Sequence, residues 1–364
     1  MKKIMLNAYT NRNLGDDLFI KVLCERYLNT EFVLYAPKEY KEFTQNSPNI
    51  NFVRSDYKIY KGINFILRKL NVNYMFTRNS VAERCDAGIY IGGSLFMQYN
   101  NWENKYKFKK GMYIPGKPFF LLGANFGPYK SDEFYLKYKS LFSNFTDICF
   151  REKYSYNLFQ DLGNVRVADD IIFQLKKDGI EEKKKEKNIV ISVIKPSRKH
   201  ISNLDEIYYN KIKDIAIYFI NRDYNVTLMS FCEPEGDNEA VEKIISLIPF
   251  EYSDRIARHL YELNIEETLE VISKSSLIIA TRFHAMILGW IYNRPVYPIA
   301  YSEKMTNVME DVNFKGAFAN LDNISETDPK EIFESMDRNI IDISKQIVNS
   351  EKHFAILDEY LLNK

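Results

Sequence analysis

The sequence SLIIATRFHA, residues 276–285, contains the repeating unit on which the fold is built. Four apolar residues, Leu277–Ala280, are typical of a buried strand. Thr281 and Arg282 form a short polar loop, and a helix is predicted over His284–Tyr292. An apolar strand that leads through a short loop into a helix is the unit of a parallel α/β sheet, so this stretch predicts such a sheet.

The same alternation extends to both sides of this stretch. Strands are predicted in the first half at Lys3–Leu6, Phe32–Tyr35, Ala87–Ile91, Pro118–Gly123 and Asp147–Phe150. They are predicted in the second half at Ile189–Val193, Asn225–Ser230, Leu277–Ala280 and Pro295–Ile299. Helical spacing follows several of them, at Asp17–Tyr27, Lys153–Leu162, Asp205–Asn221 and Gly236–Leu247. The pattern predicts the α/β class with two Rossmann-like domains.

Chain length supports this division, because 364 residues correspond to about two domains. The charged stretch Lys176–Asn188 is predicted to be a solvated linker. Residues 1–178 are therefore predicted to form the N-terminal domain and residues 179–345 the C-terminal domain. Residues 346–364 are predicted to form a helix that packs back on the N-terminal domain. Two such domains facing each other would leave a central cleft at the carboxyl ends of their strands, where open α/β sheets bind ligands.

Composition excludes several classes of function. The net charge of +1 gives no general attraction to nucleic acid. The four cysteines form no CxxC pair, which argues against a zinc or redox site and favours buried free thiols in a reducing cytoplasm. No run approaches 18 apolar residues and the N-terminal apolar run is too short for a signal peptide, so we expect a soluble cytoplasmic protein.

Cationic side chains follow several of the predicted strands. Arg151 follows Asp147–Phe150, Arg282 and His284 follow Leu277–Ala280, and Lys304 comes shortly after Pro295–Ile299. An arginine can hold a carboxylate or phosphate with two hydrogen bonds, and histidine exchanges protons near neutral pH. Arg151 paired with a nearby acid and Lys304 as a solvated surface residue are the structural alternatives. Together these residues predict a site for a small polyanion, with acid–base and electrostatic chemistry and without a metal.

Polar and glycine-rich loops follow other predicted strands. These are Asn13-Leu-Gly-Asp16-Asp17, Gly92-Gly93-Ser94 and Gly123–Pro128, which contains Asn125. Paired glycines allow a ligand or another stretch of backbone to come close, and they also occur in plain tight turns. Asp16 or Asp17 is suited to capping the helix that follows.

The order and spacing of these motifs resemble the polysaccharide pyruvyl transferase family over about Lys2–Asp311. The resemblance rests on Asn13–Asp16, Gly92–Leu95, Gly123–Pro128, Arg151–Ser155, Ala168–Asp170 and above all Arg282–Ala285. It implies a GT-B-like fold, phosphoenolpyruvate as donor and co-substrate, and a sugar acceptor with two hydroxyls. The product would be a pyruvate ketal on a capsule, exopolysaccharide or cell-wall glycan.

The resemblance also implies roles for individual residues. Arg151, His284 and Lys304 match the family's donor-binding residues, with Arg282 just before the histidine. His284 is the candidate acid, base or phosphate ligand, and Asp17 the candidate base for a sugar hydroxyl. Acceptor or cleft contacts are expected from the loops with Asn13, Asp16, Gly92, Gly93, Ser94 and Asn125. Ser94 replaces a third glycine and Tyr-Ser-Glu precedes Lys304, two departures that concern the acceptor more than the donor.

Two other functions remain open at this stage. A GT-B glycosyltransferase using a nucleotide sugar would share the fold, and so would a non-catalytic relative that binds sugar or phosphate. No cofactor is expected. A lipid-linked acceptor would bring the protein to the inner face of the membrane.

Overall fold

The computed structural model describes the chain except residues 46, 70–75, 177–184, 200, 202 and 363–364. The chain divides into two compact units. The first consists of Met1–Thr10, Asp16–Gln174 and Ile347–Lys364, and the second of Asn11–Gly15 and Leu175–Gln346. Most of the predicted linker, residues 177–184, lies outside the described residues.

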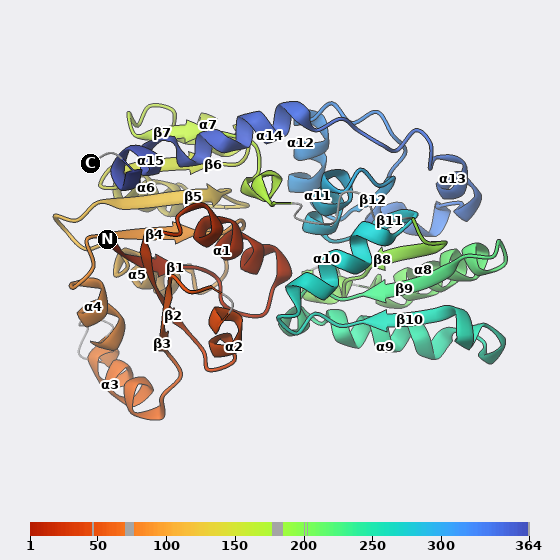
Figure 1. Ribbon diagram of the computed structural model, residues 1–364, viewed down its shortest axis with the longest axis horizontal. Helices are drawn as coiled ribbons and strands as arrows, with labels where there is room; N and C mark the ends of the chain where they lie inside the picture. The colour runs from red at the N-terminus through yellow and green to blue at the C-terminus, as the bar shows by residue number, and fades with distance from the viewer. Residues whose placement is uncertain (46, 70–75, 177–184, 200, 202, 363–364) are drawn as a thin grey trace. The chain divides into compact units, whose positions relative to one another are not determined.

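The first unit is built on a parallel sheet with the strand order β3-β2-β1-β4-β5-β6-β7 (Figure 1). Its strands are β1 (Lys3–Asn7), β2 (Glu31–Ala36), β3 (Ile50–Arg54), β4 (Ala87–Ile91), β5 (Phe119–Ala124), β6 (Asp147–Phe150) and β7 (Val165–Val167). The order reverses between β1 and β4, which defines a topological switch point where ligands bind in open α/β sheets. Strands β4, β5 and β6 are buried throughout, as expected of parallel strands covered on both faces.

Helices connect these strands in chain order. They are α1 (Leu14–Arg26), α2 (Tyr40–Gln45), α3 (Lys58–Lys69), α4 (Phe76–Ala82), α5 (Trp102–Lys110), α6 (Asp132–Phe142) and α7 (Lys153–Phe159). Aromatic rings from the loops after β4 and β5 pack on α6. Phe96 meets Tyr138 and Phe142 edge-on, each with 5.1 Å between ring centroids. This packing fixes the loops that follow β4 and β5.

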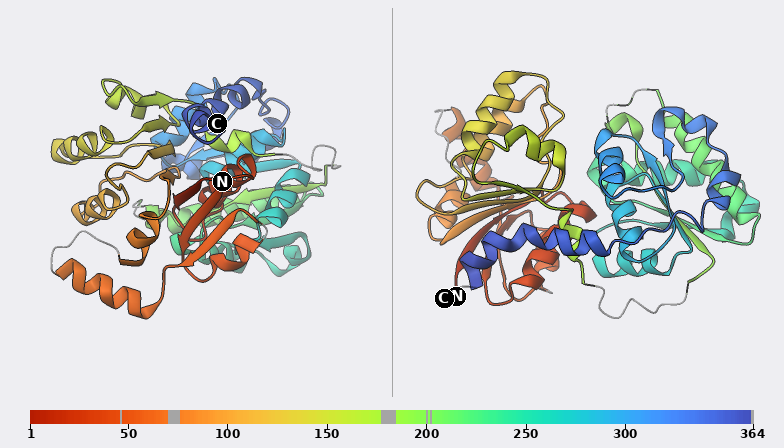
Figure 2. Two further views of the ribbon diagram at one scale, coloured as in Figure 1. Left: turned by 60° about the vertical axis from the view of Figure 1, so that its left-hand side comes forward. Right: turned by 90° about the horizontal axis from the view of Figure 1, so that it is seen from above.

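The end of the chain returns to the first unit. Helix α14 spans Ser344–Ser350, a 3₁₀ turn follows at Glu351–Phe354, and α15 spans Ala355–Leu362 (Figure 2). Arg26 Nη2 lies 2.6 Å from Asp358 Oδ2, and the Tyr27 hydroxyl donates to Asp358 Oδ1 at 2.6 Å. These contacts tie α15 to α1, the first helix of the chain.

The second unit repeats the same topology. Its parallel sheet has the strand order β10-β9-β8-β11-β12-β13, with the switch point between β8 and β11. The strands are β8 (Asn188–Ser192), β9 (Asn225–Met229), β10 (Ile256–His259), β11 (Leu277–Ala280), β12 (Val296–Ala300) and β13 (Ala319–Asn320). The helices are α8 (Asp205–Ile220), α9 (Asp237–Leu247), α10 (Ile265–Lys274), α11 (Phe283–Ile291), α12 (Glu303–Asp311) and α13 (Pro329–Glu334).

Each predicted strand is present, with ends shifted by no more than one residue, and the prediction of two parallel α/β domains is confirmed. The prediction missed β3, β7, β10 and β13, which are short or lie at sheet edges. It also did not foresee that Asn11–Gly15 groups with the second unit. Within the part of the chain that the structure describes, no helix is both long and apolar enough to cross a membrane.

Candidate functional site

Arg151 is the centre of a polar cluster at the carboxyl edge of the first sheet. It follows β6, and its side chain is 3% exposed. Arg151 Nη1 donates to Asp170 Oδ2 at 2.9 Å, and Nη2 donates to Asn125 Oδ1 at 2.8 Å. The guanidinium is thus paired with a buried carboxylate, as in the structural alternative in which Arg151 pairs with a nearby acid. Such a buried pair is costly to break, because either partner alone would leave an uncompensated charge.

The loops after β4 and β5 complete this cluster. Gly93 lies directly against Arg151: a Cβ at Gly93 would lie 2.6 Å from Nη1 and 2.8 Å from Cζ and Nη2. The Ser94 hydroxyl donates to Asn125 Oδ1 at 3.2 Å, and the Asn125 backbone N–H donates to the Gly93 carbonyl at 2.9 Å. We grouped Arg151 with the donor residues, but its neighbours here are the residues predicted for the acceptor loops.

Two adjacent acids at the start of α1 differ in their surroundings. Asp16 is partly exposed, and its Oδ1 would lie 3.1 Å from a Cβ at Gly92, whose φ of +148° favours glycine. Asp17 is fully buried, and its Oδ1 accepts a hydrogen bond from the Tyr40 hydroxyl at 2.8 Å. A buried carboxylate engaged in this way does not fit the role of base that we predicted for Asp17. Of the two, Asp16 is the one that solvent reaches.

A buried cation that the sequence did not reveal lies at the same switch point. Arg78 is 1% exposed, and its Nε and Nη2 donate to Asn7 Oδ1 at 3.0 and 2.8 Å, at the end of β1. Its Nη1 donates to the Gly111 carbonyl at 2.8 Å. Burial lowers the pKa of Arg78 to about 10. The arginine remains cationic at neutral pH and adds positive potential below the loops that follow β1 and β4.

In the second unit, Arg282 links two loops at the switch point. It is the N-terminal cap of α11, and its backbone N–H donates to Ser192 Oγ, at the end of β8, at 3.1 Å. Its guanidinium hydrogen-bonds Glu235 and Asp237, both of which follow β9. Burial would raise the pKa of Glu235, but the charges of Arg282 and Lys199 outweigh burial and hold that pKa well below its usual range. The Arg282 charge is thus already balanced by protein carboxylates.

Asp237 is itself held firmly. Its Oδ2 accepts hydrogen bonds from the backbone N–H groups of Phe231 and Cys232, each at 2.9 Å. The Asp237 side chain is fully buried. Burial raises the pKa of Asp237 against the opposing effect of Arg282. The pair fixes the start of α9 relative to the start of α11, so Arg282 positions the first turn of α11, which carries His284.

Lys199 and Lys304 both lie near Tyr301, the residue that follows β12. The Tyr301 ring centroid is 5.7 Å from the Nζ of each lysine, and Lys304 Nζ is also 5.4 Å from the Phe283 ring. Burial would raise the pKa of Tyr301, but Lys304, Lys199 and Arg282 together outweigh it and lower that pKa. Three cations therefore act on one phenol at the carboxyl edge of the second sheet.

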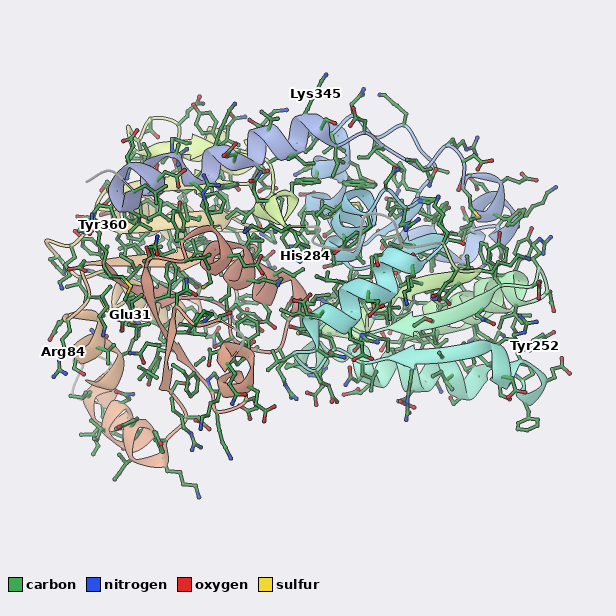
Figure 3. The ribbon with its side chains drawn as sticks, viewed as in Figure 1. Glu31, Arg84, Tyr252, His284, Lys345 and Tyr360 are labelled. Carbon is green, nitrogen blue, oxygen red and sulfur yellow. The ribbon has the colours of Figure 1, made fainter. Side chains whose placement is uncertain are left out.

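His284 is the second residue of α11 and is partly exposed (Figure 3). The ring of Phe283 meets it edge-on at 5.0 Å. Gly15 also lies directly against the imidazole: a Cβ at Gly15 would come within 1.7 Å of His284 Nδ1. Asn13 Oδ1 accepts from the Gly15 N–H at 3.1 Å, and Asn13 bridges to Cys232. The loop predicted from Asn13 to Gly15 thus orients the imidazole and requires glycine to do so.

The described residues contain no group of three His, Cys, Asp or Glu side chains that could hold a metal ion. All four cysteines are buried free thiols. Burial raises the pKa of Cys149 and of Cys232 to about 12 in each case, so neither is a reactive thiolate at neutral pH.

Comparison with known proteins identifies the family. The family model for polysaccharide pyruvyl transferase matches residues 13–303, most of the chain. The chain belongs to the polysaccharide pyruvyl transferase family. The matched range includes Arg151, Arg282 and His284 and ends one residue before Lys304.

Individual relatives of this family member are distant. It is 21% identical to the amylovoran biosynthesis protein AmsJ of Erwinia amylovora over 247 residues. That match covers 62% of this chain and 59% of AmsJ, so it spans less than two thirds of the relative's length.

Solved structures agree on the fold. The UDP-GlcNAc 2-epimerase of Neisseria meningitidis is 11% identical to this chain, with a TM-score of 0.61 and an alignment that covers 100% of both chains. Anabaena HepE, solved with UDP and glucose, is also 11% identical over 100% of both chains, with a TM-score of 0.58. At this identity the likeness shows the GT-B-type fold alone, which agrees with the fold class predicted from the sequence.

Some polar residues of this pyruvyl transferase family member escaped sequence reasoning. The lysine after β8, Lys199, was missed although it belongs to the run Lys195-Pro-Ser-Arg-Lys199, whose position after a strand was a usable signal. Glu235 and Asp237 were missed because nothing in their sequence shows that they face Arg282.

Proposed function

We propose that this protein moves the pyruvyl group of phosphoenolpyruvate onto two hydroxyls of one sugar of a bacterial polysaccharide, as a cyclic ketal. The observation that carries the proposal is the gathering of Lys199 and Lys304 at the Tyr301 ring, where the charge of Arg282 also acts, close to the start of α11, the helix that carries His284. A donor with both a phosphate and a carboxylate needs several cations close together. Family membership over residues 13–303 supports the same reaction.

The reaction balances without a cofactor. A proton adds to the methylene carbon of phosphoenolpyruvate, and positive charge develops at the carbon that carries the phosphate. One sugar hydroxyl forms a C–O bond there, and the C–O bond to phosphate breaks. The second hydroxyl then closes the ketal. Of the two hydroxyl protons, one is balanced by the new methyl group and the other by the released hydrogen phosphate.

The residues of the second unit suit the donor half of this reaction. In our scheme Lys304 neutralises the donor anion together with Lys199, whose Nζ also hydrogen-bonds Glu235. Arg282, paired with Glu235 and Asp237, positions the start of α11. His284 lies in the first turn of that helix, where the helix dipole favours negative charge. In our scheme it binds the phosphate and delivers the proton to its leaving oxygen.

The residues of the first unit suit the acceptor. Ser94 and Asn125 offer a hydroxyl and an amide at the carboxyl edge of the sheet, and the buried Arg151–Asp170 pair holds Asn125 in place. Asp16, which is partly exposed beside Gly92, takes the place of Asp17 as the base for a sugar hydroxyl. A central cleft shared by the two units stays a prediction.

Thermal unfolding with and without ligands tests the donor assignment. A ligand at about a hundred times its Kd stabilises the native state by about 2.7 kcal/mol. We expect phosphoenolpyruvate to raise the melting temperature, and the rise to disappear in Lys199→Ala and Lys304→Ala but not in Lys330→Ala, an exposed lysine of α13. A rise with UDP-sugars and none with phosphoenolpyruvate would favour a glycosyltransferase and overturn the proposal.

A further inference from the structure

Helix α3, Lys58–Lys69, differs from the other helices of the first unit in what it leaves exposed. It follows the edge strand β3 and lies at the margin of the unit in both Figures 1 and 2. None of its described side chains is fully buried. Ile59, Phe65 and Ile66 are 72%, 52% and 58% exposed. Large apolar side chains gathered on one short helix in this way indicate an interaction surface.

The exposed residues of α3 share one face. Lys58, Gly62, Phe65 and Lys69 are three or four positions apart, and Ile59 and Ile66 flank them at the same spacing. Among the residues that the structure describes, nothing lies within 4 Å of a Cβ placed at Gly62, so none of them covers this position. The opposite face, with Tyr60, Ile63 and Leu67, is half-buried. The helix therefore presents a second apolar stripe outward, in addition to the one it uses for packing.

The charge of the helix has one sign. Residues 57–69 read YKIYKGINFILRK and contain no Asp or Glu. Lys58 and Lys69 stand at the two ends of the outward face, and Lys69 Nζ lies 4.9 Å from the centroid of the Phe65 ring. Apolar side chains flanked by lysines are typical of helices that lie in the interface of a bilayer, with the lysines at the level of the headgroups.

We propose that the outward face of α3, formed by Lys58, Ile59, Phe65, Ile66 and Lys69, docks the protein on an anionic phospholipid bilayer. The charge selects this occupant. A second copy of the chain placed symmetrically on this face would bring lysines against lysines, whereas an anionic surface is complementary to them. The inference stands apart from pyruvyl transfer, because binding to a bilayer is measured without turnover.

Fluorescence offers a direct test. The two native tryptophans, Trp102 and Trp290, are 7% and 1% exposed and give a constant background. A Phe65→Trp variant should shift to the blue and be quenched by brominated lipid when vesicles of phosphatidylcholine and phosphatidylglycerol are added. Phe250→Trp, at a side chain 90% exposed in the second unit, is the matched control and should not respond.

Sedimentation with the same vesicles measures the affinity. We expect the double variant Phe65→Ser/Ile66→Ser to lose binding by at least about tenfold. We expect Lys58→Gln and Lys69→Gln to lose about fivefold each, and vesicles of phosphatidylcholine alone to bind weakly. The exposed variant Lys107→Gln on α5 should bind as the wild type does.

Two results would overturn the proposal. The first is wild-type protein that ignores phosphatidylglycerol vesicles while its circular dichroism and melting temperature are normal. The second is a wild-type dimer, seen by analytical ultracentrifugation, that Phe65→Ser/Ile66→Ser converts to a monomer without any change in vesicle binding; a second copy would then be the partner of this face.

Discussion

Gly93 is the position where the structure allows the sharpest prediction. In Gly93→Ala the new Cβ would lie 2.6 Å from Arg151 Nη1, and ordinary van der Waals contact begins at 3.4 Å. The guanidinium must therefore retreat by about 0.8 Å. A retreat of that size can stretch its bonds to Asp170, 2.9 Å, and to Asn125, 2.8 Å, by up to about 0.8 Å, beyond hydrogen-bonding distance.

The loss of stability depends on the charge and the burial of the groups that these bonds join. A hydrogen bond to a charged group contributes about 1.5–3 kcal/mol, and breaking a buried ion pair costs about 3–5 kcal/mol. Partial relaxation of the long side chain offsets some of this, so we expect the free energy of unfolding of the first unit to fall by about 2–4 kcal/mol. Because Asn125 loses its support, we also expect pyruvyl transfer to fall by about a hundredfold.

Tryptophan fluorescence in urea isolates the unit concerned. The first unit has one tryptophan, Trp102, and the second has Trp290, so the experiment is done in a Trp290→Phe background. Gly163→Ala is the matched control, since a Cβ there would meet nothing within 4 Å. If Gly93→Ala unfolds at the same urea concentration as Gly163→Ala and keeps full activity, the reasoning about Arg151 is refuted.

Three further variants test other parts of the account. Asp16→Asn should lower the steady-state rate of transfer by about 10²–10⁴-fold. Asp17→Asn should mainly lower the free energy of unfolding, by about 1.5–3 kcal/mol, measured from urea midpoints. If Asp17→Asn instead loses the rate and Asp16→Asn loses the stability, Asp17 is the base. Asp237→Ala leaves Arg282 without one of its carboxylates and should destabilise the second unit by about 3–5 kcal/mol, measured through Trp290 fluorescence; a loss below about 1 kcal/mol would show that the pair is unimportant. Burial lowers the pKa of His353 from 6.5 to about 3. As the pH falls below 6.5, His353 is therefore protonated in the unfolded chain while it stays neutral in the native state. The free energy of unfolding should therefore decrease toward pH 3 by up to about 1.4 kcal/mol per pH unit, and His353→Gln should remove that part of the slope; an unchanged slope in urea titrations would contradict the assignment.

The interior of both sheets could be predicted from the sequence. Strands such as β4 and β11 are buried throughout and therefore appear as continuous apolar runs. Edge strands such as β10 carry exposed side chains on an IARH sequence and lack that signal. The loop Asn11–Gly15 could not be assigned to the second unit, because its contacts with Cys232 depend on tertiary structure.

For the candidate site, the sequence indicated the correct loops but not the contacts made by their side chains. Parallel strands bring their carboxyl ends to one edge, so cations after β11 and β12 could be expected to gather. Which carboxylates balance Arg151 and Arg282 could not be identified. Asp170 is 19 residues from Arg151 in the sequence, and Asp237 is 45 residues from Arg282. Each pair is brought together only by the order of strands in its sheet. Sequence reasoning therefore raised a nearby acid as an alternative for Arg151 without identifying it, and it treated Arg282 as available to a ligand.

The most direct test of the central claim is to follow carbon-13-labelled phosphoenolpyruvate by NMR in the presence of polysaccharide repeat-unit acceptors. We expect a new methyl signal of a pyruvate ketal that grows in equal amount with released phosphate, and we expect both to vanish in His284→Gln. Phosphate release without a ketal, or an intact donor alongside consumption of a UDP-sugar, would contradict the account.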